Sequence, residues 1–156
     1  MFRVGLGQDS HRLKLGGSLI LGGVEISKDY YLEADSDGDV ILHALFNALG
    51  SAIGEKPLGF YATPLFKKGI TDSKVFLQVI LDKLKKQKYK IENVAIVIEA
   101  KIPRFEKTLE SIRESLAKIL AIKEEQVGIS PTSGDGLTAF GRGEGIQVFS
   151  TVLLSK

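Results

Sequence analysis

Apolar residues recur with a period of two at the start of the chain, and this spacing predicts a β-strand. In the first segment the apolar side chains of Phe2, Val4 and Leu6 fall on one face, opposite Gly5 and Gly7. Glycine leaves room for another part of the chain to approach that face closely. A continuous apolar run over 93–100 is typical of a central strand covered on at least one side. A short strand over 127–129 and a long one over 146–154 are also predicted.

Two further apolar segments, 18–21 and 24–27, flank the pair Gly22-Gly23. A two-residue turn between strands needs positive φ angles, which glycine adopts without strain. This part of the chain therefore predicts a β-hairpin.

Three other segments repeat apolar residues every three or four positions, as buried or amphipathic helices do. The first is expected to run from about Asp39 to Gly50, with Ser36 and Asp39 spaced as in a capping box. The second begins at Ser73 and ends in a basic tract over 83–90, interpreted as a solvated face, and the third covers 109–120. Residues 54–71 have weak periodicity and several Gly and Pro residues, so they are predicted to form an irregular active-site loop.

The order of these elements predicts an α+β fold, an α/β sandwich in which a mixed four-stranded sheet is layered on helices and carries an extra β-hairpin. No repeat, low-complexity tract or linker divides the chain, so residues 1–156 are expected to form a single domain. A chain of 156 residues, 44% of them hydrophobic, is long enough to bury a core without disulfides or structural metals.

Composition then narrows the function classes. The chain has no cysteine, which excludes thiolate metal sites and cysteine nucleophiles and fits a reducing cytoplasm. Its formal net charge of +2 is too small to favour a nucleic acid or an anionic membrane as partner. The N-terminus lacks a signal-peptide pattern, and no apolar run approaches the roughly 20 residues of a membrane-spanning helix. We therefore expect a cytoplasmic protein that binds neither partner.

The only two histidines, His11 and His43, lie near acidic residues at element boundaries. Asp9 and His11 are two positions apart, so in an extended segment their side chains project to the same side. His43 on its helix could add a third metal ligand and leave an open coordination position, as in catalytic zinc sites. Taken alone, the motif also allows a plainer interpretation, in which Asp9 is a turn residue and His43 a hydrogen-bonded core histidine.

Near the C-terminus, the segments 132–138 and 141–145 combine hydroxyls and glycines in a way suited to backbone contact with phosphate. Arg142 adds a permanently charged donor. Two successive turns before a strand would give the same pattern.

Taken together, four segments resemble the 2-C-methyl-D-erythritol 2,4-cyclodiphosphate synthase family; in order, they are 5–12, 36–45, 100–104 and 141–146. The resemblance spans nearly the whole chain. It implies conversion of 4-diphosphocytidyl-2-C-methyl-D-erythritol 2-phosphate into the cyclic diphosphate and CMP, a phosphorus–oxygen lyase reaction of the non-mevalonate isoprenoid pathway. It also implies a homotrimer with active sites between subunits, and in some relatives an isoprenoid diphosphate on the threefold axis, near the positions of Arg142 and Glu144.

The resemblance also implies a set of site residues. Zn²⁺ or a similar divalent ion would be bound by Asp9, His11 and His43, and Mg²⁺ or Mn²⁺ would bridge the substrate phosphates near Asp135. Asp35 and Ser133 are the catalytic candidates. The substrate-binding candidates are Asp9, Ser10, His11, Asp35, Ser36, Pro57, Leu58, Gly59, Ala100, Lys101, Ile102, Pro103, Arg104, Phe105, Thr132, Ser133, Gly134, Asp135 and Arg142.

Several positions depart from the family pattern, and they cluster around the substrate rather than the zinc. Asp35 stands where a histidine is common, and Pro57-Leu58-Gly59 replaces an Asp-Ile-Gly segment that grips the erythritol hydroxyls. We hypothesise that Asp35 takes over hydroxyl recognition while pointing away from phosphate. Two alternatives remain open: a trimeric isoprenoid-diphosphate-binding protein with lost or altered catalysis, and a metal-dependent phosphoesterase.

Overall fold

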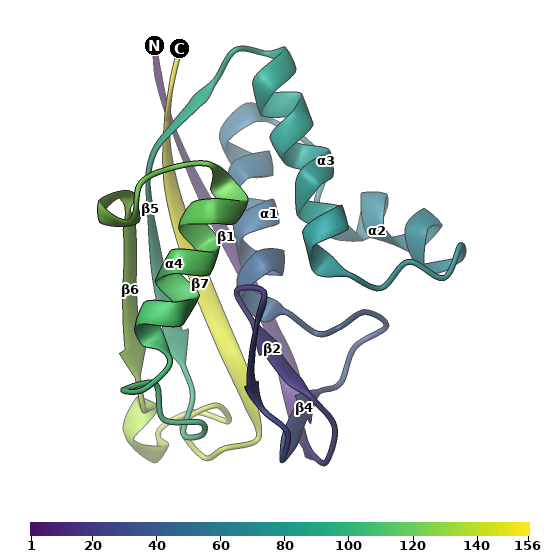
Figure 1. Ribbon diagram of the computed structural model, residues 1–156, viewed down its shortest axis with the longest axis vertical. Helices are drawn as coiled ribbons and strands as arrows, with labels where there is room; N and C mark the ends of the chain where they lie inside the picture. Colours follow the sequence, from purple (N-terminus) through teal and green to yellow (C-terminus); the bar gives the residue numbers. More distant parts are fainter.

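The computed structural model describes all of residues 1–156, and its elements follow one another in the order expected of a mixed α+β chain (Figure 1). The strands are β1 (Phe2–Leu15), β2 (Leu19–Leu21), β3 (Val24–Ser27), β4 (Tyr30–Leu32), β5 (Lys90–Glu99), β6 (Val127–Thr132) and β7 (Gly145–Ser155). The α-helices are α1 (Val40–Ile53), α2 (Leu58–Phe66), α3 (Ser73–Lys86) and α4 (Leu109–Leu120), and short 3₁₀ turns cover Glu124–Gln126 and Gly134–Gly136.

The main sheet has the strand order β4-β1-β7-β5-β6. Strand β7 pairs antiparallel with β1 and with β5, whereas β5 and β6 run parallel. These four strands are the predicted mixed sheet, and β4 adds a short fifth strand by pairing with the far end of β1 at Leu13–Leu15. Strands β2 and β3 form the predicted hairpin, with Gly22 and Gly23 at φ angles of 61° and 78°. The α+β architecture is thus confirmed.

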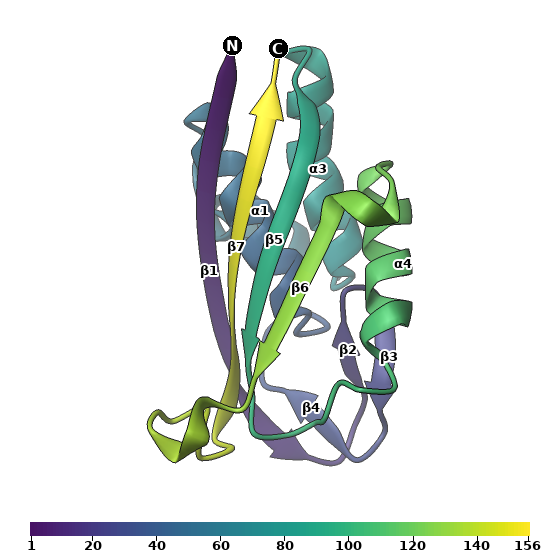
Figure 2. The same ribbon diagram turned by 90° about the vertical axis from the view of Figure 1, so that its left-hand side faces the viewer.

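Helices α1, α3 and α4 cover one face of the sheet, and the other face is bare (Figure 2). Helix α1 is almost wholly buried and lies against β1, where a Cβ at Gly5 or Gly7 would overlap backbone atoms of Ala48 or Ala44. The prediction that another segment closely approaches the glycine face is confirmed. Apolar residues of the three helices and of the covered sheet face form one buried core. This close contact fixes the position of α1 relative to β1.

The bare face of the sheet is apolar at its centre. Val4 and Leu6 of β1 are 68% and 62% exposed, and Val97 and Phe149, directly paired on β5 and β7, are 44% and 43% exposed. Large apolar side chains exposed together on one face of a sheet are typical of an interaction surface. We call these four residues the outer apolar face.

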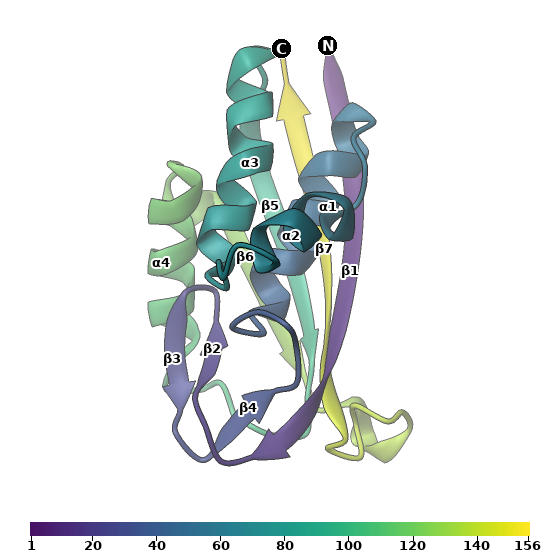
Figure 3. The same cartoon turned by 90° about the vertical axis from the view of Figure 1, so that its right-hand side faces the viewer.

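Two local predictions were wrong. Residues 54–71 were expected to be irregular, but they contain α2, which lies beside α1 and α3 (Figure 3). Side chains from other elements stabilise this helix: Asn47 accepts the N–H of Leu58, and the Phe46 and Tyr61 rings lie 5.7 Å apart. The capping box was also misplaced, because Asp39 itself caps α1 by accepting the N–H of Leu42. Ser36 instead accepts the N–H of Gly38.

None of the helices is both long and apolar enough to cross a lipid bilayer.

Candidate metal centre and substrate cavities

The three predicted metal ligands come from two elements that pack directly on each other. Asp9 and His11 lie on β1, opposite Val148 and Ile146 of β7, so the strand is extended there and both side chains project toward α1. His43 is in the first turn of α1 and is 4% exposed. The prediction that Asp9 and His11 share one side, with His43 facing them, is confirmed.

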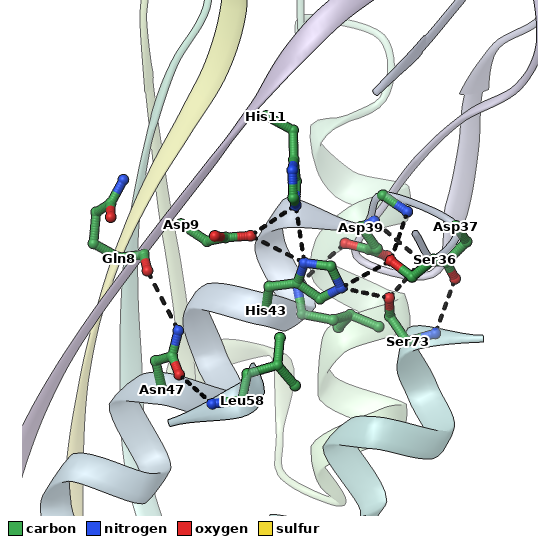
Figure 4. Close-up of polar contacts among 12 residues, drawn as sticks. Gln8, Asp9, His11, Ser36, Asp37, Asp39, His43, Asn47, Leu58 and Ser73 are labelled. Carbon is green, nitrogen blue, oxygen red and sulfur yellow. Dashed lines mark hydrogen bonds and ion pairs between the residues drawn. The ribbon is translucent and has the colours of Figure 1, made fainter. Parts of the chain in front are cut away.

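The ligand atoms converge on one point (Figure 4). Oδ2 of Asp9 lies 2.9 Å from Nε2 of His11 and 3.0 Å from Nδ1 of His43, and the two nitrogens are 3.1 Å apart. An ion bound tetrahedrally at about 2.0–2.2 Å needs ligand atoms about 3.3–3.6 Å apart, so a small outward movement admits it. Two imidazoles and one carboxylate suit zinc and several other divalent metals. The residues present therefore fit a metal ion.

The electrostatics favour the metal-binding form of Asp9. Burial acts to raise the pKa of Asp9, but its contacts with the His11 and His43 rings, and the charge of their protonated forms, outweigh burial and lower the pKa to about 2. Asp9 is therefore a carboxylate near neutral pH. Its oxygen faces two ring nitrogens, an arrangement that a shared cation stabilises.

A second carboxylate fixes the start of α1. Asp39 is fully buried and accepts the backbone N–H groups of Gly22, Gly23 and Leu42. Burial raises the pKa of Asp39 to about 6, although those donors act in the opposite direction. Asp39 thus ties the β2–β3 hairpin to the helix that carries His43.

The candidate metal ligands Asp9, His11 and His43 line a cavity of about 560 Å³. Asp35, Ser36, Pro57, Leu58 and Gly59 also line it, so the segments that depart from the family pattern meet at one site. The structure thus brings these predicted substrate-binding residues together with the ligands.

A second cavity, of about 270 Å³, lies beyond the ends of β5 and β6. Its lining includes the predicted residues Ala100, Pro103, Arg104, Phe105, Thr132 and Ser133. Strand β6 is the opposite edge strand of the sheet from β4 and β1. Within one chain, the catalytic candidate Ser133 is therefore not brought beside the metal ligands, whereas Asp35 is.

The other predicted residues lie outside both cavities. Ser10 lines a small cavity of about 230 Å³ that Glu144 also lines. Arg142 donates from Nε to Oε1 of Glu144 at 3.0 Å, and Asp135 accepts from the hydroxyl of Ser133 at 3.1 Å. Gly134 and Asp135 form a 3₁₀ turn with positive φ angles, and the backbone N–H of Lys101 donates to the carbonyl of Phe140. Ile102 is half-buried and directly precedes Pro103, which lines the second cavity.

A larger cavity, of about 610 Å³, lies between the C-terminal ends of α3 and α4 and contains none of the predicted site residues.

Sequence reasoning missed several residues of the site. Asn47 is one helical turn after His43, and its side chain lines the main cavity and accepts the N–H of Leu58. Its spacing of four residues from a candidate ligand could have revealed it. Ser73 contacts Nε2 of His43, and its hydroxyl donates to Asp37; no local pattern links Ser73 to Asp37, which are far apart in the chain.

The fold and the ligand cluster define a class of protein: a mixed α+β scaffold with a candidate centre of two imidazoles and one carboxylate in the wall of a cavity. The chain belongs to the YgbB family, whose model matches residues 2–155. A curated relative from Chlamydia trachomatis, 42% identical over 99% of this chain and 88% of its own, is named 2-C-methyl-D-erythritol 2,4-cyclodiphosphate synthase.

Two solved structures show the same fold. IspF from Plasmodium falciparum in complex with CDP is 29% identical, with a TM-score of 0.86 over 98% of this chain and 95% of that one. The bifunctional IspDF from Campylobacter jejuni is 29% identical, with a TM-score of 0.92 over 99% of this chain and 42% of that longer chain.

Proposed function

We propose that this protein is a 2-C-methyl-D-erythritol 2,4-cyclodiphosphate synthase and acts in non-mevalonate isoprenoid precursor biosynthesis. The reaction is attack of the 2-phosphate of 4-diphosphocytidyl-2-C-methyl-D-erythritol 2-phosphate on the β-phosphate, which releases CMP. The observation that carries this proposal is the convergence of Asp9, His11 and His43 in the wall of a cavity that Asp35, Ser36 and the segment 57–59 also line. Family membership and the names of the relatives agree with it.

Asp9, His11 and His43 would hold Zn²⁺ or a similar divalent ion. When bound, such an ion neutralises phosphate charge and acts as a Lewis acid on a phosphoryl oxygen. A second cation, Mg²⁺ or Mn²⁺, would travel with the diphosphate and approach the exposed carboxylate of Asp135. The attacking phosphate is largely dianionic near neutral pH, because the second pKa of a phosphomonoester is about 6. The chain therefore needs no strong general base.

The second cavity is the proposed cytidine and phosphate pocket. Its wall offers the guanidinium of Arg104 and the hydroxyls of Thr132 and Ser133, all three from exposed residues. We assign Ser133 the role of donating a hydrogen bond to the transferring phosphate as charge develops. The predicted substrate-binding segments also include Lys101, Ile102 and Gly134, which adjoin residues of this cavity in the sequence, and Arg142 in the loop before β7.

Asp35 is proposed to recognise the erythritol hydroxyls. It lines the main cavity together with Pro57-Leu58-Gly59, the segment that lacks the family carboxylate. A carboxylate accepts hydrogen bonds from hydroxyls but repels phosphate. Asp35 therefore belongs on the diol side of the substrate.

Assembly into a homotrimer would join the two cavities. They lie at opposite edges of one sheet, and the outer apolar face is uncovered in the single chain. A cyclic arrangement can place the β6 edge of one subunit beside the β1 edge of the next while burying that face. Arg142 and Glu144 would then lie near the axis, where an isoprenoid diphosphate is proposed to bind. We place this single-domain protein, residues 1–156, in the cytoplasm.

Incubation with the diphosphocytidyl substrate tests the proposal. Phosphorus NMR should show a cyclic diphosphate and chromatography should show equimolar CMP, both abolished by a chelator. The departures at Asp35 and Pro57 favour one alternative, a trimeric isoprenoid-diphosphate-binding protein without this chemistry. Binding of an isoprenoid diphosphate without CMP release would establish it, and hydrolysis products in place of the cyclic compound would indicate a phosphoesterase.

A further inference from the structure

A chain of hydrogen bonds runs from His43 to Ser73 and Asp37, on the side of the His43 ring that faces away from Asp9 (Figure 4). Nδ1 of His43 faces Asp9, whereas Nε2 points the other way and lies 2.8 Å from Oγ of Ser73. Ser73 donates its hydroxyl hydrogen to Oδ1 of Asp37, and Oδ2 of Asp37 accepts the backbone N–H of Ser73 at 3.0 Å. His43 and Ser73 are 4% and 1% exposed, so water does not compete for these contacts.

Counting hydrogens gives this chain a direction. A hydroxyl has one hydrogen, and Ser73 gives it to the carboxylate of Asp37, which has none to return. Oγ of Ser73 can therefore only accept from the ring of His43. The contact with Ser73 therefore favours the ring hydrogen on Nε2 of His43, and in a neutral imidazole this leaves Nδ1 with a free lone pair. That lone pair points at Asp9 and His11, where the ion would lie.

We propose that Ser73 and Asp37 are positioning residues that hold the neutral ring of His43 in the tautomer with hydrogen on Nε2, so that Nδ1 is ready to bind the divalent ion. The inference rests on the proposed metal site. Hydrogen-bond partners of this kind orient metal-bound histidines in many proteins. Here the partner comes from the first turn of α3, which makes the packing of α3 beside α1 part of the metal site.

Ser36 is a weaker partner for the same ring nitrogen. Its Oγ lies 3.3 Å from Nε2 of His43, compared with 2.8 Å for Ser73, and it already accepts the N–H of Gly38. Asp9 favours the opposite tautomer, because a hydrogen on Nδ1 would point directly at its carboxylate. The tautomer of metal-free His43 is thus set by a competition between Ser73 with Asp37 on one side and Asp9 on the other.

The first test reads that tautomer directly in metal-free protein. The chain has two histidines, so ¹⁵N labelling of histidine gives two ring systems, and His11→Gln assigns them. In buffer alkaline enough to keep both rings neutral, wild-type His43 should carry its hydrogen on Nε2. In Ser73→Ala the hydrogen should move to Nδ1, toward Asp9. A hydrogen on Nδ1 in the wild type, or an unchanged Nε2–H in Ser73→Ala, would overturn the proposal.

The second test measures Zn²⁺ affinity by competition with a chromophoric chelator. Ser73→Ala should raise the dissociation constant about 10- to 100-fold, the range seen when such partners are removed, and Asp37→Asn should raise it by less. Ser51→Ala is the matched control, because Ser51 also hydrogen-bonds within the α1–β1 contact but touches no ligand. Unchanged affinity in Ser73→Ala, or an equal loss in Ser51→Ala, contradicts a positioning role.

The two tests separate this proposal from the metal site on which it rests. If the wild type binds no Zn²⁺, the metal site and the role of Ser73 toward it both fail, whereas the tautomer can still be read without metal. If the wild type binds Zn²⁺ and the tautomer does not respond to Ser73, only the positioning role fails. Circular dichroism checks folding, and Asp37→Asn, which keeps the hydroxyl, carries both tests should Ser73→Ala not fold.

Discussion

The two faces of the main sheet differ in burial: helices of the same chain cover one face, and nothing in the chain covers the other. On the covered face, Gly5 and Gly7 let α1 approach β1 so closely that any side chain would overlap the helix backbone. On the bare face of the same strand, Val4 and Leu6 are 68% and 62% exposed. Alternate residues of one segment thus serve a contact made within the chain and a surface that no part of the chain covers.

This difference indicates which part of the proposed site is positioned within a single chain. The candidate metal ligands lie on the covered side, where tight packing sets their positions before any ion or partner binds. The two halves of the proposed substrate site lie at opposite edges of the sheet. In the proposed trimer, completing the substrate site would depend on the bare face, so the two faces should respond differently to mutation.

Gly7→Ala should give the largest loss of stability. Its Cβ would overlap the backbone of Ala44 and Ala48, which cannot rotate away as a side chain could. We expect the free energy of unfolding to fall by about 3 kcal/mol or more, measured by urea denaturation. Gly128→Ala is the control on the open face, where the nearest atom to a new Cβ is 3.7 Å away, and it should change stability by about 0.5 kcal/mol or less. Equal effects would remove the contrast between the faces.

The buried carboxylate of Asp39 should give the covered side a pH dependence. Its pKa is raised to about 6 from 3.8, so between these values the folded protein holds a proton that the unfolded chain releases. Stability from this group is present below pH 3.8 and is lost as the pH rises through about 6, by on the order of 3 kcal/mol. Urea unfolding of the wild type and Asp39→Asn between pH 4 and 7 measures it. If the difference in stability between the two proteins is the same across this range, the prediction is wrong.

Metal binding should add stability without reorganising the covered side. A ligand that binds only the folded state stabilises it by about 2.7 kcal/mol at a free concentration 100 times its dissociation constant. We expect this gain from Zn²⁺ in thermal or urea unfolding, with an unchanged circular dichroism spectrum, since the ligands already converge. His11→Gln should show no such gain. Refolding of secondary structure on metal addition would contradict a preformed site.

Local signals were sufficient for part of this structure. Gly22-Gly23 specifies its turn through backbone freedom, and the two-residue spacing of Asp9 and His11 specifies a shared side once the strand is extended. Both depend only on neighbours in the chain. The hairpin and two of the three ligands could therefore be predicted without tertiary information.

Long-range contacts decide the rest. Helix α2 forms in a segment with weak periodicity because Asn47 of α1 accepts the N–H of Leu58 and the ring of Phe46, also on α1, lies 5.7 Å from that of Tyr61. The contact from Ser73 to Asp37 joins α3 to the loop before α1, and neither residue carries a signal of the other. Such contacts exist only after the helices have packed, so reading the sequence one segment at a time could not find them.

The smallest expected change in stability, and the clearest change in assembly, belongs to Val97→Asp on the outer apolar face. Val75 on α3 is the matched control, because it is 41% exposed compared with 44% for Val97 and takes the same substitution. Both variants should fold, with free energies of unfolding of the isolated chain within about 1 kcal/mol of the wild type.

A charge buried between subunits is costly, so only Val97→Asp should shift sedimentation from trimer to monomer. CMP release should fall with it, because the cavity at the β6 edge would lose the neighbouring β1 edge. A trimeric Val97→Asp, or a wild type that sediments as a monomer, would show that the bare face is not the surface that completes the site.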